Sequence, residues 1–271
     1  MSPTPPVACT VAGTDSGGAA GVAADLTTFS ALGVHGACVV TAVTAQDTLG
    51  VRAVHAVPPD VVAAQLDAVL EDLPVGCVKT GMLGTPGAVR LVAARAGALP
   101  LVVDPVLVAT SGAVLGGADV VDAYRHQLLP VATVVTPNLD EARTLTGIDG
   151  PAPDLARRLA DLGTTVVLTG GADGVDWLAR PGCQPEPVRH ARVRTTNDHG
   201  TGCTFSAALA ALVASSAGRR VDGEVVRAAA EFTRARLVVG RDWRLGRGRG
   251  PVPHIALPAR STAPPHGKRN R

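Results

Sequence analysis

Short hydrophobic runs alternate along the chain with longer segments that carry a helical pattern. The runs have the length of β-strands and cover residues 7–12, 36–43, 75–79, 101–104, 132–136 and 164–169. They are continuously hydrophobic rather than alternating with polar residues, which is typical of parallel strands buried on both faces of a sheet. The pattern therefore predicts a buried, mostly parallel sheet.

The segments between and after these runs are predicted to be helices. They cover residues 20–32, 60–73, 86–96, 118–129, 138–146, 153–162, 203–217 and 222–239. In residues 60–73 the hydrophobic side chains, among them Val62, Leu66 and Val69, fall on one stripe of a helix. Strands that alternate with helices indicate an α/β fold with a central sheet. In such folds we expect ligands at the carboxyl ends of the strands.

Composition and charge restrict the class of protein further. The 271 residues are 46% hydrophobic but only 2% aromatic, so the core must consist mainly of Ala, Val and Leu. We expect one domain over residues 1–257 and a disordered basic tail over residues 258–271. A net charge of +2 gives no reason to expect nucleic acid as a partner. No hydrophobic run approaches the ~20 residues that span a membrane, and no secretory signal is visible. The cysteines are odd in number and show no C-x-x-C spacing, which favours reduced thiols in the cytoplasm.

The segment from His199 to Cys203 is the most informative motif. Gly200 and Gly202 let the backbone approach a ligand closely, and the hydrophobic segment behind them is predicted to be a buried helix. Free N–H groups at the start of that helix form an anion site. A cysteine in the first turn is also expected to lose its proton easily. An anion site beside a nucleophile or base points to phosphoryl transfer.

Polar residues follow the first two predicted strands. The glycine-rich loop 13–21 lacks the spacing of a dinucleotide-binding motif. It is either a tight turn or a substrate-facing loop in which Asp15 or Asp25 supplies an acceptor. Gln46 can donate and accept hydrogen bonds at once, which suits the edge of an aminopyrimidine; the alternative is an ordinary loop amide.

Two carboxylates and three further residues complete the candidate site. Asp104 ends a predicted strand and Glu141 lies near a helix start, so each carboxylate alone is explained by a structural capping role. If both face the anion site, they can instead bind Mg²⁺ together. Thr169 ends the last predicted strand and Gly171 follows it, at a place where small residues admit a nucleotide phosphate or ribose. Lys79 is one of only two lysines in the chain and is a further candidate for the phosphates.

Several short motifs occur in a fixed order along the chain. They are residues 12–18 (AGTDSGG), 25–33 (DLTTFSALG), 41–51 (TAVTAQDTLGV), 79–83 (KTGML), 104–106 (DPV), 111–112 (SG), 136–142 (TPNLDEA), 199–203 (HGTGC) and 248–252 (GRGPV). This series resembles the hydroxymethylpyrimidine/phosphomethylpyrimidine kinases of thiamine biosynthesis, within the ribokinase-like superfamily. The resemblance covers nearly the whole chain. It implies a three-layer α/β/α fold with a central, mostly parallel sheet, and a homodimer.

The resemblance also implies residue roles, with ATP as phosphoryl donor and Mg²⁺ held by Asp104 and Glu141. The implied pyrimidine contacts are Gly13, Ala20, Asp25, Gln46 and Met82. The implied anion site around the transferred phosphoryl group is Gly200, Thr201, Gly202 and Cys203. Cys203 stands where most sugar kinases of the superfamily have an aspartate base. Thr169 and Ala172 depart from a lysine and a histidine common in the family, which removes a positive charge near the ATP phosphates.

Two other functions remain open at this point. A pyridoxal or pyridoxine kinase acts on a related hydroxymethyl heteroaromatic compound and also uses the cysteine variant of the loop. A non-catalytic pyrimidine-binding sensor is suggested by Thr169 and Ala172, although the intact Asp104, Glu141 and 200–203 set argues against it. We expect the aminopyrimidine kinase because Gln46 and Met82 favour that ring. A sugar kinase is disfavoured because the 199–203 loop lacks the aspartate.

Overall fold

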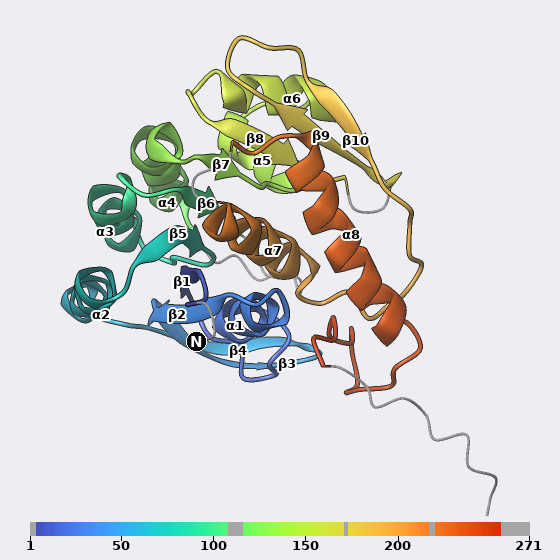
Figure 1. Ribbon diagram of the computed structural model, residues 1–271, viewed down its shortest axis with the longest axis horizontal. Helices are drawn as coiled ribbons and strands as arrows, with labels where there is room; N and C mark the ends of the chain where they lie inside the picture. Colours follow the sequence, from blue (N-terminus) through green and yellow to red (C-terminus); the bar gives the residue numbers. More distant parts are fainter. Residues whose placement is uncertain (1–3, 108–115, 171–172, 217–219, 256–271) are drawn as a thin grey trace, which may run out of the picture.

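The computed structural model describes residues 4–107, 116–170, 173–216 and 220–255, and its centre is an eight-stranded sheet (Figure 1). The strands are β1 (Val7–Ala12), β2 (His35–Val40), β5 (Val75–Thr80), β6 (Leu101–Val103), β7 (Val134–Val135), β8 (Thr165–Leu168), β9 (Val175–Ala179) and β10 (Glu186–Arg189). Their spatial order is β10-β9-β8-β7-β6-β5-β1-β2. Neighbours from β8 to β2 pair in parallel, whereas β9 is antiparallel to both β8 and β10. The predicted mostly parallel sheet is confirmed.

Helices cover both faces of this sheet and produce three layers (Figure 1). One face carries α1 (Gly21–Ala31), α7 (Thr201–Ser215) and α8 (Gly223–Gly240). The other carries α2 (Pro59–Asp72), α3 (Pro86–Ala96), α4 (Ala118–Ala123), α5 (Leu139–Thr146) and α6 (Ala152–Ala160). The expected three-layer α/β/α fold is therefore confirmed.

Small and branched aliphatic side chains form the two halves of the core. On one side of the sheet, Leu66 and Val92 are fully buried, and on the other, Phe29 and Leu209 are fully buried. Burial of each large apolar side chain contributes about 1.5–3 kcal/mol. α7 is hydrophobic around most of its circumference because it lies between the sheet, α1 and α8.

Local sequence signals set the start of the helices that approach the site. Asn138 caps α5 and forms a capping box with Glu141, whose carboxylate accepts the Asn138 N–H at 2.9 Å. Thr85 caps α3 in the usual way, by accepting the N–H of Ala88. Gly200, in contrast, precedes α7 without a side-chain cap. The first turn of α7 is thus left open to a ligand.

Most predicted elements are present, but five segments differ from the prediction. The run 36–43 is divided at Thr41, because β3 (Ala42–Asp47) leaves the main sheet and pairs with β4 (Gly50–Ala56) as a separate antiparallel hairpin. β4, β9 and β10 were not predicted from the sequence. The predicted helix 118–129 consists of α4 followed by a π-helical turn (Tyr124–Leu128) and a 3₁₀ turn (Leu129–Val131).

Two further observations concern the chain as a whole. No helix within the described residues is long and apolar enough to cross a membrane. The cysteines in the described part of the chain are free thiols, with Cys9 and Cys77 buried and Cys38 partly buried. Residues 258–271, the predicted tail, lie outside the described residues, as does the predicted pair at 111–112.

Candidate active site

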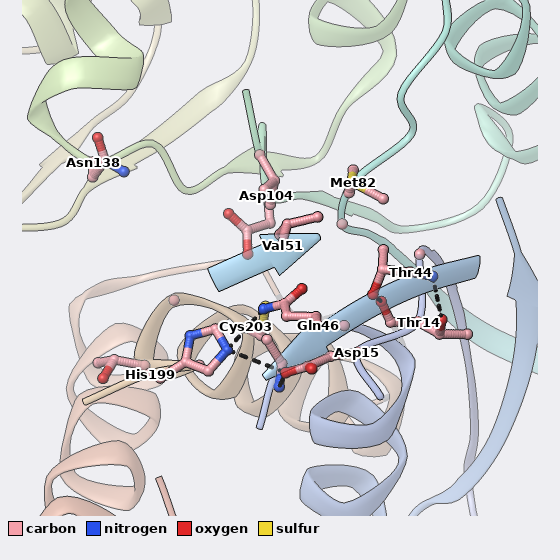
Figure 2. A pocket seen from close by; sticks show the side chains of 18 of the residues that line it. Thr14, Asp15, Thr44, Gln46, Val51, Met82, Asp104, Asn138, His199 and Cys203 are labelled. Carbon is pink, nitrogen blue, oxygen red and sulfur yellow. Dashed lines mark hydrogen bonds and ion pairs between the residues drawn. The ribbon is translucent and has the colours of Figure 1, made fainter. Parts of the chain in front are cut away.

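A cavity of about 190 Å³ opens at the carboxyl edge of the parallel strands (Figure 2). The chain leaves β1 toward β2 on one side and later builds β5 to β8 on the other, so this edge contains the switch point where α/β folds bind ligands. The lining residues are Gly13, Thr14, Asp15, Ala20, Gly21, Thr44, Gln46, Val51, Gly81, Met82, Asp104, Val106, Thr136, Asn138, Glu141, Thr169, Asp198, His199, Gly200, Thr201, Gly202 and Cys203. Most of the predicted site residues therefore meet around one cavity, although they come from distant parts of the chain.

Asp15 organises the loop after β1. Its carboxylate accepts the N–H groups of Gly17 at 2.8 Å, Ala19 at 3.1 Å and Ala20 at 2.9 Å. Its Oδ2 also lies 3.1 Å from His199 Nε2. Burial acts to raise the pKa of Asp15, but the His199 hydrogen bond and the backbone N–H groups outweigh it and hold the pKa below its usual value. Asp15 is thus an ionised anchor of the loop.

The loop of residues 199–203, called the anion loop below, packs closely against the loop that follows β1. Gly200 has a φ of +89°, and a Cβ there would collide with the carbonyl oxygen of Ala19. Only glycine meets both conditions without strain. The Thr201 N–H is taken by the Asp198 carbonyl at 3.2 Å, whereas no acceptor within the described residues takes the N–H groups of Gly202 and Cys203. Two backbone donors at the start of α7 are therefore available to an anion.

Asp104 and Glu141 line the same cavity as this loop's free donors and are both buried. The hydroxyl of Ser206 donates to Asp104 Oδ2 at 2.9 Å. Burial raises the pKa of Glu141 to about 8, with the neighbouring Asp104 as the next cause. Burial likewise raises the pKa of Asp104, against the opposing charge of Lys79. Two buried carboxylates that repel each other form a donor set that a divalent cation would stabilise.

Asp25 and Lys79 do not line the cavity, which corrects the expectation that they contact ligands directly. Both side chains are 0% exposed, and Lys79 Nζ lies 2.8 Å from both carboxylate oxygens of Asp25. The Thr10 hydroxyl donates to the same carboxylate at 2.6 Å. A Cβ on Gly81 would lie 3.4 Å from Lys79 Nζ, so the ammonium lies directly beneath the cavity floor. The pair acts on the site through its charge rather than by contact.

The structure also corrects the expectation that Cys203 is easily deprotonated. Burial raises the pKa of the Cys203 thiol to about 12, although the Lys79 charge and a hydrogen bond from the Gly21 N–H act in the other direction. Desolvation thus outweighs the effect of the helix start. At neutral pH the free protein carries a neutral thiol at this position.

A second cavity, of about 140 Å³, adjoins the first along the start of α7. Thr169, Thr201 and Gly202 line both cavities. The second is further lined by Asp176, His190, Ala191, Arg192, Val193, Phe205, Ala230, Thr233, Arg234 and Leu237. Thr169 is therefore placed where the two cavities meet, while Gly171 and Ala172 lie outside the described residues.

Some lining residues had no role assigned from the sequence. His199 belongs to the predicted motif, and its side chain lies within hydrogen-bonding distance of both Asp15 and Gln46 (Figure 2). Asp198 lies just before this motif, and Arg249 pairs with both of its carboxylate oxygens, with Nε at 2.8 Å from Oδ1. Arg249 is 51 residues away in the sequence, so local spacing gave no signal for this pair.

No cluster of three or more metal-ligating side chains occurs in the described part of the chain. Asp104 and Glu141 alone would give a cation only part of its oxygen ligands. Mg²⁺ is commonly held in this way, by one or two carboxylates together with water and substrate phosphates. The donor set therefore fits a cation that arrives with a phosphate ligand.

Comparison with known proteins gives consistent results. The family model described as phosphomethylpyrimidine kinase matches residues 15–253. A hydroxymethylpyrimidine/phosphomethylpyrimidine kinase of Synechococcus elongatus is 44% identical over 262 residues, covering 92% of this chain and 97% of the relative. An ADP complex of Bacillus subtilis pyridoxal kinase superposes with a TM-score of 0.83 at 33% identity, covering 93% of this chain and 98% of that one. A phosphomethylpyrimidine kinase of Clostridium difficile gives a TM-score of 0.71 at 33% identity, covering 84% and 98%.

Proposed function

The chain belongs to the phosphomethylpyrimidine kinase family, and we propose that it uses ATP to phosphorylate the hydroxymethyl group of 4-amino-5-hydroxymethyl-2-methylpyrimidine. The resulting monophosphate is then phosphorylated to the diphosphate, as a step of thiamine biosynthesis. The observation that carries this proposal is the shared wall of the two cavities, Thr169, Thr201 and Gly202. The phosphoryl donor and the phosphoryl acceptor can bind on either side of the free N–H groups that begin α7.

The first cavity suits a small polar ring with a hydroxymethyl group. Met82 lies against Gly13 so closely that any side chain at Gly13 would displace it, which leaves a narrow slot for a flat ring. Gln46 contributes the amide that reads the ring edge. Ala20 and Asp15 form the end of the slot nearest the anion loop. The hydroxymethyl group of such a ring would point toward Gly202 and Cys203.

The second cavity suits the nucleotide. Its lining is mostly apolar, with Arg192 and Arg234 as cations at its wall. These arginines offer positive charge to the phosphates on the side where Thr169 supplies only a hydroxyl. The anion loop would then lie between the terminal phosphoryl group and the acceptor.

Mg²⁺ is proposed as the cofactor that accompanies ATP. Asp104 and Glu141 would hold it, because their burial and mutual repulsion are relieved by a divalent cation. When bound, the ion would neutralise phosphate charge during transfer. Ser206 orients Asp104, and the capping box orients Glu141, so both carboxylates are fixed beforehand.

Cys203 is the proposed acceptor of the proton that leaves the hydroxymethyl group. A thiol accepts a proton only as the thiolate, and a pKa of about 12 makes the thiolate a minor form at neutral pH. The ammonium of Lys79 and the N–H of Gly21 stabilise that minor form. Positioning and charge stabilisation then supply most of the rate enhancement.

We further propose a homodimer in the cytoplasm. The β3–β4 hairpin lies apart from the main sheet (Figure 1). It exposes three large apolar side chains, Val43 at 53%, Leu49 at 56% and Val54 at 49%. Exposed apolar side chains on a two-stranded sheet are stabilised by contact with another surface. A second copy of the chain is the proposed partner. Equilibrium sedimentation of the wild type beside Val43→Lys tests it, because a dimer formed through this surface would dissociate in the variant.

The function is tested by a coupled ATP-consumption assay with Mg²⁺ and the hydroxymethylpyrimidine, with products resolved by mass. Monophosphate followed by diphosphate supports both steps, and monophosphate alone limits the function to the first. Binding of the pyrimidine without any product would favour the non-catalytic sensor. Pyridoxal is assayed in parallel, because the similarity to pyridoxal kinase favours it as a second candidate. A higher kcat/KM for pyridoxal than for the pyrimidine would identify pyridoxal as the substrate instead.

A further inference from the structure

We propose that His199, held by Asp15, fixes the side-chain amide of Gln46 in one of its two orientations and so selects a 4-aminopyrimidine over the corresponding 4-oxopyrimidine. The proposal rests on the proposed function, since it takes the first cavity as the pyrimidine site. His199 acts here as a positioning residue and Gln46 as the residue that contacts the ring.

The three side chains form one hydrogen-bonded group on the cavity wall (Figure 2). His199 Nε2 lies 3.1 Å from Asp15 Oδ2 and 3.0 Å from the side-chain amide nitrogen of Gln46. The side chains of His199 and Asp15 are only 11% and 2% exposed, so water competes little for these contacts. The same imidazole nitrogen therefore faces a carboxylate and an amide at once.

The charge of Asp15 decides which atom of Gln46 faces the imidazole. Asp15 accepts three backbone N–H groups, and its lowered pKa keeps it ionised, so it needs a donor at His199. Nε2 must therefore carry the proton, and a protonated nitrogen has no lone pair for an amide N–H. The stable orientation of Gln46 therefore turns its carbonyl oxygen toward His199, in exchange for the amide nitrogen that lies there in the structure. The heavy-atom positions of an amide fit both orientations, so this assignment follows from the hydrogen-bonding requirement.

The backbone of Gln46 leaves the amide little other freedom. The Ser16 hydroxyl donates to the Gln46 carbonyl at 2.7 Å, and its oxygen accepts the Gln46 N–H at 2.7 Å. A shift in the pairing of β3 with β4 occurs between Ala45 and Gln46, and such irregularities redirect a side chain. The main chain is thus fixed on both sides, and rotation of the amide is the remaining choice.

A fixed amide reads one pattern of donors and acceptors. With one lone pair of its oxygen turned to His199, the second can accept from a 4-amino group, and the amide nitrogen can donate to the adjacent ring nitrogen. A 4-oxopyrimidine offers the reverse pattern, an oxygen acceptor beside a ring N–H. It would leave polar groups unpaired or require the amide to turn against His199. Sites built on such hydrogen bonds discriminate strongly against the wrong pattern.

The test compares 4-amino-5-hydroxymethyl-2-methylpyrimidine with its 4-oxo analogue in the wild type, His199→Leu and His199→Gln. Both kcat/KM and the calorimetric Kd are measured for each compound. We expect the wild type to prefer the amino compound at least 100-fold. In His199→Leu, the ratio of amino to oxo kcat/KM should be at least tenfold smaller. His199→Gln should retain most of it, because its amide N–H can replace Nε2–H. His55→Leu, on the exposed face of β4, is the control and should keep the full preference.

The outcomes separate this proposal from the proposed function. An unchanged amino-to-oxo ratio in folded His199→Leu overturns the role of His199, even if turnover is normal. Equal wild-type affinity for the two compounds also overturns it. Absence of turnover with a preserved preference in Kd contradicts the kinase but supports the amide orientation. If His199→Leu does not fold, Asp15→Asn decides: it removes the charge that fixes the proton, so an unchanged ratio there also overturns the proposal.

Discussion

Lys79→Met is expected to destabilise the protein strongly, although Lys79 lines neither cavity. The Lys79 ammonium and the Asp25 carboxylate are both completely buried, with Nζ 2.8 Å from each oxygen. Burial acts to lower the pKa of Lys79, but the Asp25 carboxylate outweighs it and raises that pKa above its usual value. The pair is therefore ionised in the folded protein, and its two charges depend on each other.

The size of the effect follows from the charge that is left behind. Methionine replaces the aliphatic part of lysine with little change in volume, so a cavity contributes little to the loss. Among the residues that the structure describes, Asp25 would keep the Thr10 hydroxyl as its remaining hydrogen-bond partner. Breaking a buried ion pair in this way costs about 3–5 kcal/mol. For a chain of this size, that corresponds to a decrease in Tm of roughly 10 °C.

Urea unfolding of the wild type, Lys79→Met and the double variant Lys79→Met/Asp25→Val measures this effect. The double variant removes both charges and should recover most of the loss, because a buried pair is only weakly stabilising relative to apolar residues. Arg95→Met is the control, since the Arg95–Asp67 pair is about 40% exposed and should contribute no more than about 1 kcal/mol. A loss below about 1 kcal/mol in Lys79→Met, or a double variant no more stable than the single one, would refute the reasoning.

Three further predictions concern the chemistry and the two ligands. Cys203→Ala should lower kcat about 100-fold with little change in Tm. Because the pKa of the Cys203 thiol is about 12, the wild-type kcat should rise about tenfold per pH unit between pH 7 and 9.5. A flat pH profile would contradict the role of Cys203 as the base. Gln46→Leu should raise the pyrimidine KM at least tenfold and leave the ATP KM unchanged; equal effects on both would contradict its contact with the ring. Arg192→Ala should raise the ATP KM about tenfold, whereas Arg194→Ala, which lines neither cavity, should not.

The sequence predicted the edge of the sheet where the site lies more reliably than the chemistry of single residues. Continuous hydrophobic runs located the parallel strands, and the polar residue after each run then had to lie at the carboxyl edge. Asp104 and Thr169 were placed near the anion loop for this reason, and the structure brings both to the cavity. The β3–β4 hairpin was missed because the first residues of β3 continue the apolar run of β2 in the sequence.

Burial accounts for the incorrect expectations at the site. Asp25 and Lys79 are polar residues in predicted elements beside the cavity, and only the packing of α1 against the sheet decides that they face inward. Cys203 lies at a helix start, which by itself lowers a thiol pKa, but desolvation is the larger effect at this position. Neither the direction of a side chain nor the degree of its desolvation can be read from spacing along the chain.

The free N–H groups of the anion loop lie beside a carboxylate, and these opposite charge preferences determine what the site can bind tightly. The free N–H groups of Gly202 and Cys203 favour an anion, yet a Cβ on Gly202 would lie only 3.9 Å from the carboxylate of Asp104. An isolated phosphate would therefore be repelled by Asp104, and an isolated cation would find no group of three or more ligating side chains among the described residues. A metal–phosphate complex satisfies both sides at once, because its cation meets the carboxylates and its oxygens meet the backbone donors. We therefore expect metal and nucleotide to bind cooperatively, each increasing the affinity for the other by the same factor.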